Sequence, residues 1–292
     1  MSNLIRRLRG KAPLVNIDLP GLPRFRMETH GRSDACVSRS IEDWGRWEPN
    51  STAVVRQLLT EPADFIDIGA NIGWYTLVAA HALAGRGHVH SFEPDPAHAA
   101  KLRANLVVNR LDNVTVNEVA LSDRAATATL HLDAHNRGDN SLLPLSTRHG
   151  SATVEVTRLD TYGGLAGERP LVIKIDVQGS EIDVLNGAMA LLEAYPREVV
   201  LVVEVSPAML AAGGRSVQDL AGLLDSLGFA AAIIDRPKPR ILPMSWERLV
   251  GQMAAEEARN PDADRDVVAY RRIDGLMAPF FGTADRSTAR AS

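Results

Sequence analysis

Cysteine is almost absent from this sequence, since Cys36 is the single one among 292 residues. An internal disulfide, a cysteine-based zinc site and a redox pair are therefore excluded, and we expect a reducing compartment, the cytoplasm. Long apolar runs are lacking too, because none approaches the ~18 residues that span a bilayer. The basic residues Arg6, Arg7, Arg9 and Lys11 have no apolar signal core behind them. We therefore expect neither a membrane span nor a secretion signal.

Positive charge and aromatic rings are also scarce. The formal net charge is −4, the sequence pI is about 6.1 and aromatic residues make up 5% of the chain. Basic surfaces attract nucleic acid and anionic membranes, and base stacking needs aromatic side chains, so neither partner is expected. The composition, 45% hydrophobic and 23% charged, is that of an ordinary globular protein. We expect a small molecule as the partner, and the oligomeric state stays open, a homodimer included.

The chain divides into three stretches by composition and periodicity. Residues 1–50 are rich in Pro, Gly and Arg with little periodicity, and we expect them to cap the main domain. Residues 51–275 form that domain, and within it 124–165 are expected to be an insertion of exposed strands around a polar loop at 133–150. Residues 276–292 are expected to be a disordered tail.

Short apolar runs alternate with segments of helical periodicity through the main domain. Strands are predicted at 65–68, 88–92, 114–121, 171–175, 199–205, 230–234 and 266–270. Helices are predicted at 72–83 and 96–109, from a capping box at Ser180 to residue 192, and at 217–227. This alternation predicts an α/β, doubly wound domain with a mostly parallel, seven-stranded sheet. No helix is predicted between the last two strands, which indicates an antiparallel hairpin at one edge.

A glycine-containing turn, Asp67-Ile68-Gly69-Ala70-Asn71-Ile72-Gly73, joins the first core strand to the first helix. Glycines there let the backbone turn tightly and approach a ligand, which in a parallel sheet lies beyond the carboxyl ends of the strands. Glu93 ends the next strand, 24 residues after Gly69. A carboxylate at that position can accept hydrogen bonds from both hydroxyls of an unmodified ribose.

The turn departs from both common phosphate-binding patterns. Asn71 stands where a dinucleotide site has its second glycine, and the sequence has no G-x-x-x-x-G-K-[ST] loop. Asp67 places negative charge at the turn, which repels phosphate and attracts a ligand that carries an ammonium and a sulfonium group. S-Adenosylmethionine has both groups and a ribose, so we predict it as the cofactor and disfavour a nicotinamide cofactor.

Four ordered blocks of the sequence resemble the FkbM family of methyltransferases: 65–76 (FIDIGANIGWYT), 92–94 (FEP), 119–123 (VALSD) and 174–181 (KIDVQGSE). The resemblance spans about residues 47–201, and Gln178 stands where the family usually has Glu. It implies a class I methyltransferase (Rossmann-like) fold and S-adenosylmethionine as the cofactor. It also implies O-methylation of small molecules such as sugars or polyketide-type metabolites.

By position, the resemblance implies a set of cofactor-binding residues: Asp67, Gly69, Ala70, Asn71, Gly73, Thr76, Glu93, Pro94, Ala120, Leu121, Ser122 and Asp176. The turn would line the methionine end of the cofactor, with Thr76 reaching its carboxylate. Glu93 would hold the ribose, and the end of the third strand would lie near the adenine.

Methyl transfer to a hydroxyl needs alignment and a base or a metal ion, because the sulfonium is already a good leaving group. Asp176 and Glu204 end the fourth and fifth strands and are the predicted catalytic acids. Lys174 lies two residues before Asp176 and is either catalytic or its buried ion-pair partner. No spacing of His, Asp and Glu identifies a metal site, so the metal stays open.

Contacts to the acceptor are predicted from polar residues beside this edge of the sheet: Asn140, Ser141, His149 and Glu181. Asn140 and Ser141 could equally form a solvated turn, and Glu181 could be a favourable charge at a helix start. The acceptor pocket is expected from the loop 133–150, the N-terminal segment and 237–253. N-methylation of an amine or amide and a catalytically silent cofactor-binding subunit are the alternatives.

Overall fold

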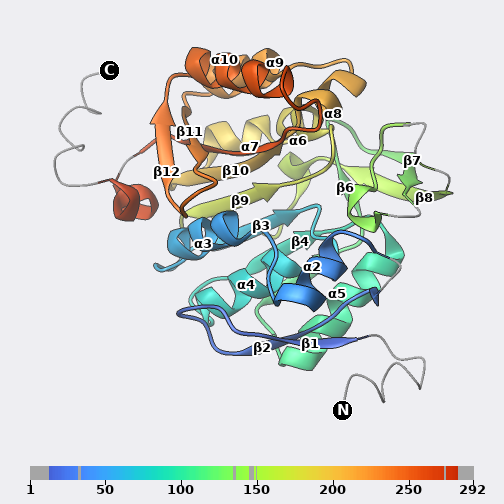
Figure 1. Cartoon of the computed structure of the whole chain (residues 1–292). Helices are drawn as coiled ribbons and strands as arrows, with labels where there is room; N and C mark the ends of the chain where they lie inside the picture. The colour runs from blue at the N-terminus through green and yellow to red at the C-terminus, as the bar shows by residue number, and fades with distance from the viewer. Residues whose placement is uncertain are drawn as a thin grey trace.

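A computed structural model of the chain describes residues 13–31, 34–133, 136–144, 148, 150–272 and 274–281. Its centre is an eight-stranded sheet in the order β12-β11-β13-β10-β9-β3-β4-β5 (Figure 1). The strands are β3 (Asp64–Ile68), β4 (Val89–Phe92), β5 (Val114–Asn117), β9 (Leu171–Ile175), β10 (Val199–Val205), β11 (Ala230–Ile234), β12 (Ile241–Met244) and β13 (Arg265–Tyr270). Five of them, from β5 to β10, are parallel, and β13 runs antiparallel between β10 and β11. This is the class I methyltransferase fold, with β12 added at one edge.

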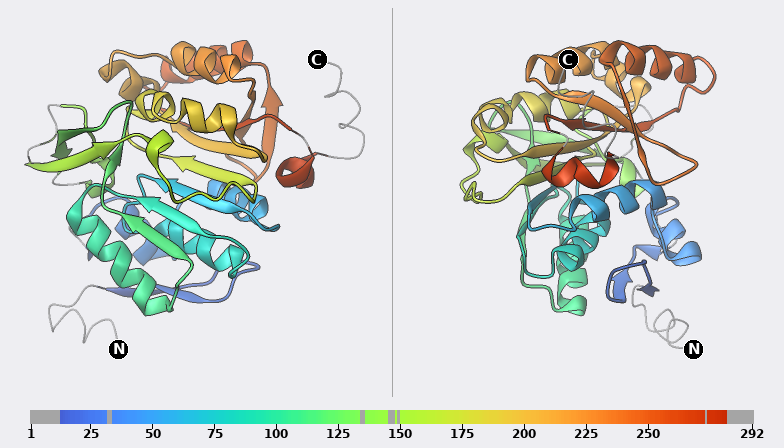
Figure 2. Two further views of the ribbon diagram at one scale, coloured as in Figure 1. Left: turned by 180° about the vertical axis from the view of Figure 1, so that it is seen from behind. Right: turned by 90° about the vertical axis from the view of Figure 1, so that its left-hand side faces the viewer.

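The central strands are buried on both faces, which explains their unbroken apolar runs. Every residue of β3 and β9 is buried. Helices cover both faces of the sheet, as the views in Figure 2 show. One face is covered by α3 (Pro49–Leu58), α4 (Trp74–Leu83) and α5 (Pro96–Asn109), the other by α6 (Glu181–Asn186), α7 (Met189–Ala194), α8 (Pro207–Ala212), α9 (Val217–Ser226) and α10 (Trp246–Glu257). Successive strand residues alternate between the two cores, so Val172 packs toward the first layer and Ile173 toward the second.

The N-terminal segment completes the first of these layers. Strands β1 (Leu14–Ile17) and β2 (Phe25–Glu28) form an antiparallel hairpin, and α2 (Val37–Trp44) follows them. Asn105 of α5 accepts a hydrogen bond from the Glu28 backbone N–H and donates one to the Glu28 carbonyl. Ile17 and Met27 are fully buried in the same core as α4. The hairpin is therefore packed onto the domain rather than suspended beside it.

The predicted third strand, 114–121, is two strands in the structure. β5 forms the edge of the main sheet, whereas β6 (Ala120–Leu121) pairs with β8 (Gly150–Thr157) in a separate three-stranded sheet with β7 (Ala126–Leu132). A run of apolar residues does not reveal which sheet each half joins, because pairing depends on contacts distant in sequence. The exposed strands predicted within the insertion are present as β7 and β8. The described part of the loop between them lies at the carboxyl end of the main sheet.

The strands at one edge of the sheet differ from those that we predicted. We predicted seven strands and missed β12, whose Pro243 removes a backbone donor and is tolerated because the strand lies at the edge. The antiparallel edge hairpin is formed by β11 and β12. β13 lies inside the sheet and is preceded by α10, a helix that we did not predict.

The helix predicted from Ser180 to residue 192 is interrupted. α6 ends at Asn186, and at the following C-cap residue, Gly187, an added Cβ would lie 1.9 Å from the Ser122 carbonyl oxygen. The Ser180 side chain makes no capping hydrogen bond, so the capping box is wrong. The predicted N-cap of α5 is confirmed, since the Asp95 side chain accepts a hydrogen bond from the Ala97 N–H.

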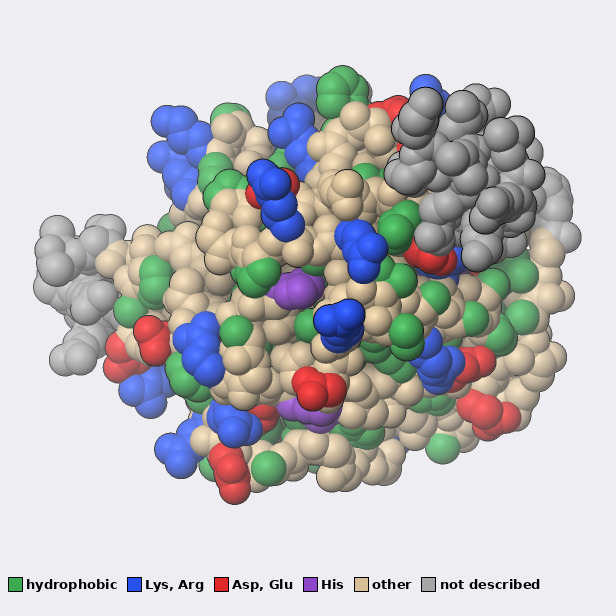
Figure 3. Space-filling view, turned by 90° about the horizontal axis from the view of Figure 1, so that it is seen from below, with side chains coloured by type: hydrophobic (Ala, Val, Ile, Leu, Met, Phe, Trp, Pro, Cys, Tyr) green, Lys and Arg blue, Asp and Glu red, His purple; other side chains and the backbone are tan. Residues whose placement is uncertain are grey.

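The C-terminal end of the described chain packs against the domain. Gly275–Phe280 forms a 3₁₀ helix with Leu276 and Met277 buried, so the packed core extends past residue 275, where we expected the tail to begin. In the described ranges, no helix combines the length and apolarity needed to cross a membrane. Acidic and basic side chains are interspersed over the described part of the face in Figure 3.

Candidate active site

A cavity of about 550 Å³ opens at the carboxyl ends of β3, β4, β9 and β10. This size suits a ligand of a few tens of heavy atoms. The turn after β3 and the end of β4 form one part of its wall, and the ends of β9 and β10 form another. The insertion and the N-terminal segment contribute the rest, including Ser141 and Trp47.

The glycine turn folds tightly against the end of β9. Gly69 has a φ of 81°, and an added Cβ would lie 1.9 Å from the Asp176 carbonyl oxygen. Only glycine allows both the left-handed backbone and this close approach. Gly73 also has a positive φ, but its missing side chain makes room for Leu102, at 2.2 Å from an ideal Cβ, and it does not line the cavity. The structure therefore accounts for Gly73 by helix packing, and the predicted ligand role of this glycine stays a prediction.

Glu93 ties the turn to the end of β4. Its carboxylate accepts hydrogen bonds from the Asn71 N–H at 2.7 Å and from the Asp95 N–H at 2.8 Å. Only 5% of Glu93 is exposed, and the residue lines the cavity. His98 lies behind it, with its Nδ1 3.7 Å from a Glu93 oxygen. Since a carboxylate has about four acceptor sites, Glu93 can accept further bonds from a ligand.

Asp67 is buried in β3 beneath the turn. The Thr76 hydroxyl donates to its carboxylate at 2.6 Å and lies 2.7 Å from the Ser91 hydroxyl. Burial raises the pKa of Asp67 to about 6, and the Thr76 hydrogen bond and the charge of Lys174 oppose that rise. Thr76 is fully buried and does not line the cavity, so its predicted contact with the ligand stays a prediction. Its hydroxyl orients Asp67.

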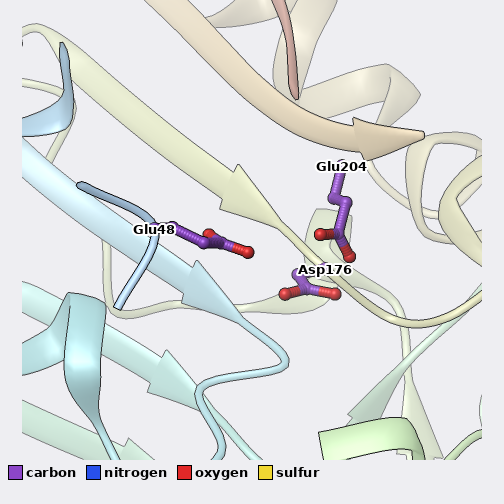
Figure 4. Close-up of side chains that lie close together, drawn as sticks. All are labelled: Glu48, Asp176 and Glu204. Carbon is purple, nitrogen blue, oxygen red and sulfur yellow. The ribbon is translucent and has the colours of Figure 1, made fainter. Parts of the chain in front are cut away.

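Three carboxylates converge at the opposite part of the cavity (Figure 4). Asp176 follows β9, Glu204 ends β10, and Glu48 comes from the turn before α3. One oxygen from each lies within 4.8 Å of the others, and among the described residues this is the group close enough to share a cation. Gln178 donates to Asp176 at 2.8 Å and to Glu204 at 3.0 Å, which holds these two side chains together.

The positive charge beside this acid cluster belongs to Lys174. The side chain is fully buried, with its Nζ 3.3 Å from Asp266 and 4.0 Å from Asp176, and 5.3 Å from the centre of the Tyr75 ring. Burial disfavours the ammonium, but the carboxylates of Asp266 and Asp176 outweigh it and hold the pKa of Lys174 well above its ordinary value. The predicted ion pair with Asp176 is present, and Asp266 is a closer partner that we did not predict.

Burial favours the protonated forms of Glu48 and Glu204. Burial, followed by the charge of Asp266, raises the pKa of Glu48 to about 7. Burial and the carboxylates of Asp176 and Glu48 raise the pKa of Glu204 well above its ordinary value. Lys174 opposes both shifts. The cavity therefore contains carboxyl groups that can exchange a proton in the neutral range.

Thirteen of the predicted site residues line this cavity: Asp67, Gly69, Ala70, Asn71, Glu93, Pro94, Ala120, Leu121, Asn140, Ser141, Lys174, Asp176 and Glu204. Asn140 also donates to Asp95 and Ser141 to the Gln178 carbonyl, so both hold the insertion against the sheet. His149 lies outside the described residues.

Two further predicted residues do not line the cavity. Ser122 is buried behind the end of β6, where its N–H donates to the Thr157 carbonyl. Glu181 is 3% exposed, and its carboxylate accepts from the Gly179 N–H at 2.9 Å. The carboxylate closes the turn before α6, and the predicted contact of Glu181 with an acceptor stays a prediction.

Sequence reasoning missed Glu48, Tyr75, His98 and Asp266 among the residues at or beside the site. For Glu48 a signal was present, since Pro49 at the first helical position marks a helix start and so places Glu48 at its N-cap. Asp266 is an acid at the start of a buried strand, opposite Glu204 in the antiparallel pair. Tyr75 and His98 lie on helices, where no local pattern separates a cavity residue from a core residue.

Comparison with known families identifies the protein family of the chain that forms this cavity. The model of the methyltransferase FkbM domain matches residues 67–230, more than half of the chain. The chain belongs to the FkbM methyltransferase family. It is accordingly an enzyme that transfers methyl groups, and S-adenosylmethionine is its cofactor.

This FkbM-family chain is similar to one curated relative and to two solved structures, as follows. The 2-O-methyltransferase NoeI of Sinorhizobium fredii is 30% identical over 214 residues, which cover 66% of this chain and 85% of the relative. An FkbM methyltransferase of Methylobacillus flagellatus has a TM-score of 0.44 at 16% identity, and the match covers 71% of this chain and 43% of that one. An S-adenosylmethionine-dependent O-methyltransferase of Thermotoga maritima has a TM-score of 0.43 at 17% identity, covering 80% and 69%.

Proposed function

We propose that the enzyme methylates a hydroxyl group of a small polar acceptor of the sugar type. The observation that carries this proposal is the convergence of Glu48, Asp176 and Glu204 in the same cavity as the glycine turn. A hydroxyl is a weak nucleophile and needs a proton acceptor, which a carboxylate supplies. Carboxylates also accept the several hydrogen bonds that a polyhydroxy compound offers. The relative named a 2-O-methyltransferase supports the same reaction.

The cofactor occupies the part of the cavity formed by the turn and β4 in this proposal. Glu93 and Pro94 would hold the ribose, and Ala120 and Leu121, with Phe92 beside them, offer an apolar surface for the adenine. Gly69, Ala70 and Asn71 would border the methionine part. The negative charges of Asp67 and Asp176 suit the ammonium and sulfonium groups. S-Adenosylmethionine would supply a methyl group that is already activated by its positive sulfur.

Asp176 and Glu204 are the proposed acceptor-binding pair. The Asp176 N–H donates to the Ile68 carbonyl, so this residue lies directly against the cofactor turn. Gln178 fixes both carboxylates by its amide hydrogens. Lys174 is engaged by Asp266 and Asp176, and we assign it to holding this arrangement by charge.

The charge of the cavity limits the acceptor class. Among the described residues, its lining contains eight acidic side chains and one lysine: Glu48, Asp67, Glu93, Asp139, Asp176, Glu204, Asp262 and Asp264 against Lys174. A phosphorylated or carboxylated acceptor would face repulsion in such a cavity. We therefore expect a neutral polyol or an amine-bearing sugar.

The test is a transfer assay with methyl-labelled S-adenosylmethionine against neutral, amine-bearing and phosphorylated sugars, with the product's methylated atom identified by NMR. We expect an O-methyl product. Asp176→Asn should reduce kcat/KM for the acceptor by about ten-fold or more, because hydrogen bonds to a charged group contribute about 1.5–3 kcal/mol each. Transfer to nitrogen, or tight cofactor binding without transfer to any acceptor, would contradict the proposal.

A further inference from the structure

Glu48 has a strained backbone at the edge of the cavity. It is the N-cap residue of α3, and its φ of 39° lies in the left-handed region that residues with a side chain rarely adopt. Such conformations persist where the surrounding structure enforces them, and they cluster at functional sites. Pro49 follows at the first helical position, so the strained turn leads directly into the helix.

This turn carries the Glu48 carboxylate into the cavity, toward Asp176 and Glu204 (Figure 4). The Tyr75 hydroxyl, on α4, donates to one of its oxygens at 2.6 Å. In the described part of the chain this is the one hydrogen bond assigned to that carboxylate. Asp176 and Glu204 share one donor, the Gln178 amide, which holds these two carboxylates together. Glu48 is held separately by Tyr75, and its remaining lone pairs can accept a hydrogen bond from an acceptor hydroxyl.

The groups facing Glu48 come from every element packed around it. They are Tyr75 on α4, Lys174 on β9, Asp176 after β9, Glu204 on β10 and Asp266 on β13. Burial and the acids raise its pKa to about 7, while Lys174 and the Tyr75 hydrogen bond oppose the rise. A base that titrates near the working pH is both ionised often enough to accept a proton and basic enough to hold it.

We propose that Glu48 is the general base that removes the proton from the acceptor hydroxyl, an inference that rests on the proposed O-methylation. As the acceptor oxygen bonds to the methyl carbon, the carbon–sulfur bond breaks with its electron pair on sulfur, and the hydroxyl proton passes to a Glu48 oxygen. The protonated Glu48 returns that proton to water when the product leaves. The N-terminal segment, which lies outside the FkbM domain match, thereby supplies a catalytic residue.

The experiment compares Glu48→Gln with wild type in the full chain, using the hydroxyl acceptor found in the transfer assay. Glutamine keeps an oxygen for the Tyr75 hydrogen bond but accepts no proton, so a merely structural role would survive the change. We expect kcat to fall by about 100-fold or more and the acid limb of its pH profile to disappear. Cofactor affinity, measured by calorimetry, should stay within roughly two-fold of wild type.

Tyr75→Phe provides a graded second variant. Loss of the hydroxyl removes a hydrogen bond that favours the ionised Glu48, so the acid limb should move to higher pH while the rate at high pH is retained. A readout without turnover is ¹³C NMR of the cofactor-free chain labelled at Glu carboxyls. Glu48→Gln should lack one of the resonances that titrate near pH 7 in wild type, whereas the resonance of Glu181, whose pKa is also raised to about 7, should remain. Glu61→Gln, at an exposed position, should match wild type in every measurement.

The outcomes separate this inference from the proposed function. If wild type forms an O-methyl product and Glu48→Gln keeps its rate and its acid limb, Glu48 is not the base and only this inference fails. If wild type methylates nitrogen or no acceptor at all, the proposed function fails first and the inference with it. Should Glu48→Gln unfold, an unchanged acid limb in Tyr75→Phe would overturn the inference.

Discussion

Lys174 is a buried cation, and the side chains next to its ammonium are carboxylates. Its ammonium lies against Asp266 and Asp176 in a fully buried position. Lys174→Met would leave these carboxylates without their counter-charge, and removing one partner of a buried pair costs about 3–5 kcal/mol. Thermal or denaturant unfolding should show a loss of that order. The control is Lys238→Met, at an exposed position, which should unfold like wild type. If Lys174→Met also unfolded like wild type, the charge of Lys174 would have no structural role.

Glu93 is the residue on which the cofactor subsite depends most. Its carboxylate fixes the turn through Asn71 and is proposed to hold the ribose. Glu93→Ala should weaken S-adenosylmethionine binding by at least about ten-fold, because hydrogen bonds to a charged group contribute about 1.5–3 kcal/mol each. Calorimetric titration measures this directly, with the exposed Glu155→Gln as the control. Equal affinities in Glu93→Ala and wild type would remove Glu93 from the subsite.

At this scale the sequence predicted the residues that end strands. Asp176, Glu204 and Glu93 follow buried apolar runs, and parallel strands bring their carboxyl ends to one edge. Thr76 and Glu181 do not line the cavity, because they bond to Asp67 and to the Gly179 N–H, and a linear pattern does not reveal such hydrogen bonds.

At the scale of the element, the glycine turn is defined by how closely it approaches β9. Gly69 and Gly85 have nearly the same φ, 81° and 80°, but an added Cβ meets the Asp176 carbonyl at 1.9 Å at Gly69 and nothing within 4 Å at Gly85. Gly85→Ala should therefore cost only the left-handed backbone, about 1–2 kcal/mol. Gly69→Ala adds a backbone clash and should lose more stability together with cofactor binding. Denaturant unfolding of the pair checks this, and equal losses would contradict it.

Elements with a clear hydrophobic pattern could be predicted, and those with a weak pattern could not. β9, β10 and β11 occur at the predicted bounds. β12 was hidden by Pro243, and the long helix after Ser180 was overestimated because Gly187 must pass close to the Ser122 carbonyl. The N-terminal segment was expected near the acceptor, but Glu48 itself was not, since little periodicity surrounds it.

At the scale of the whole molecule, buried carboxyl groups make stability depend on pH. Burial raises the pKa of both Glu48 and Glu181 to about 7, above their value in the unfolded chain. Their contribution is fully present below the unfolded pKa and is lost as the pH rises through about 7. Stability should therefore fall between mildly acidic and mildly basic pH.

Glu181→Gln isolates one of these two groups outside the cavity. It cannot ionise, so its stability should fall less with rising pH, by on the order of 1–3 kcal/mol. Denaturant unfolding at several pH values measures the difference. A pH dependence identical to wild type would show that Glu181 does not ionise differently in the folded chain. The homodimer and the cytoplasmic location stay predictions, and the former is open to size-exclusion chromatography with light scattering.

The most direct measurement is a crystal structure of the chain with S-adenosylhomocysteine and a hydroxyl acceptor. We predict ribose hydroxyls on the Glu93 carboxylate and an acceptor oxygen within hydrogen-bond distance of Glu48. A cofactor bound away from the Gly69 turn, or an acceptor that does not reach the acid cluster, would contradict this prediction.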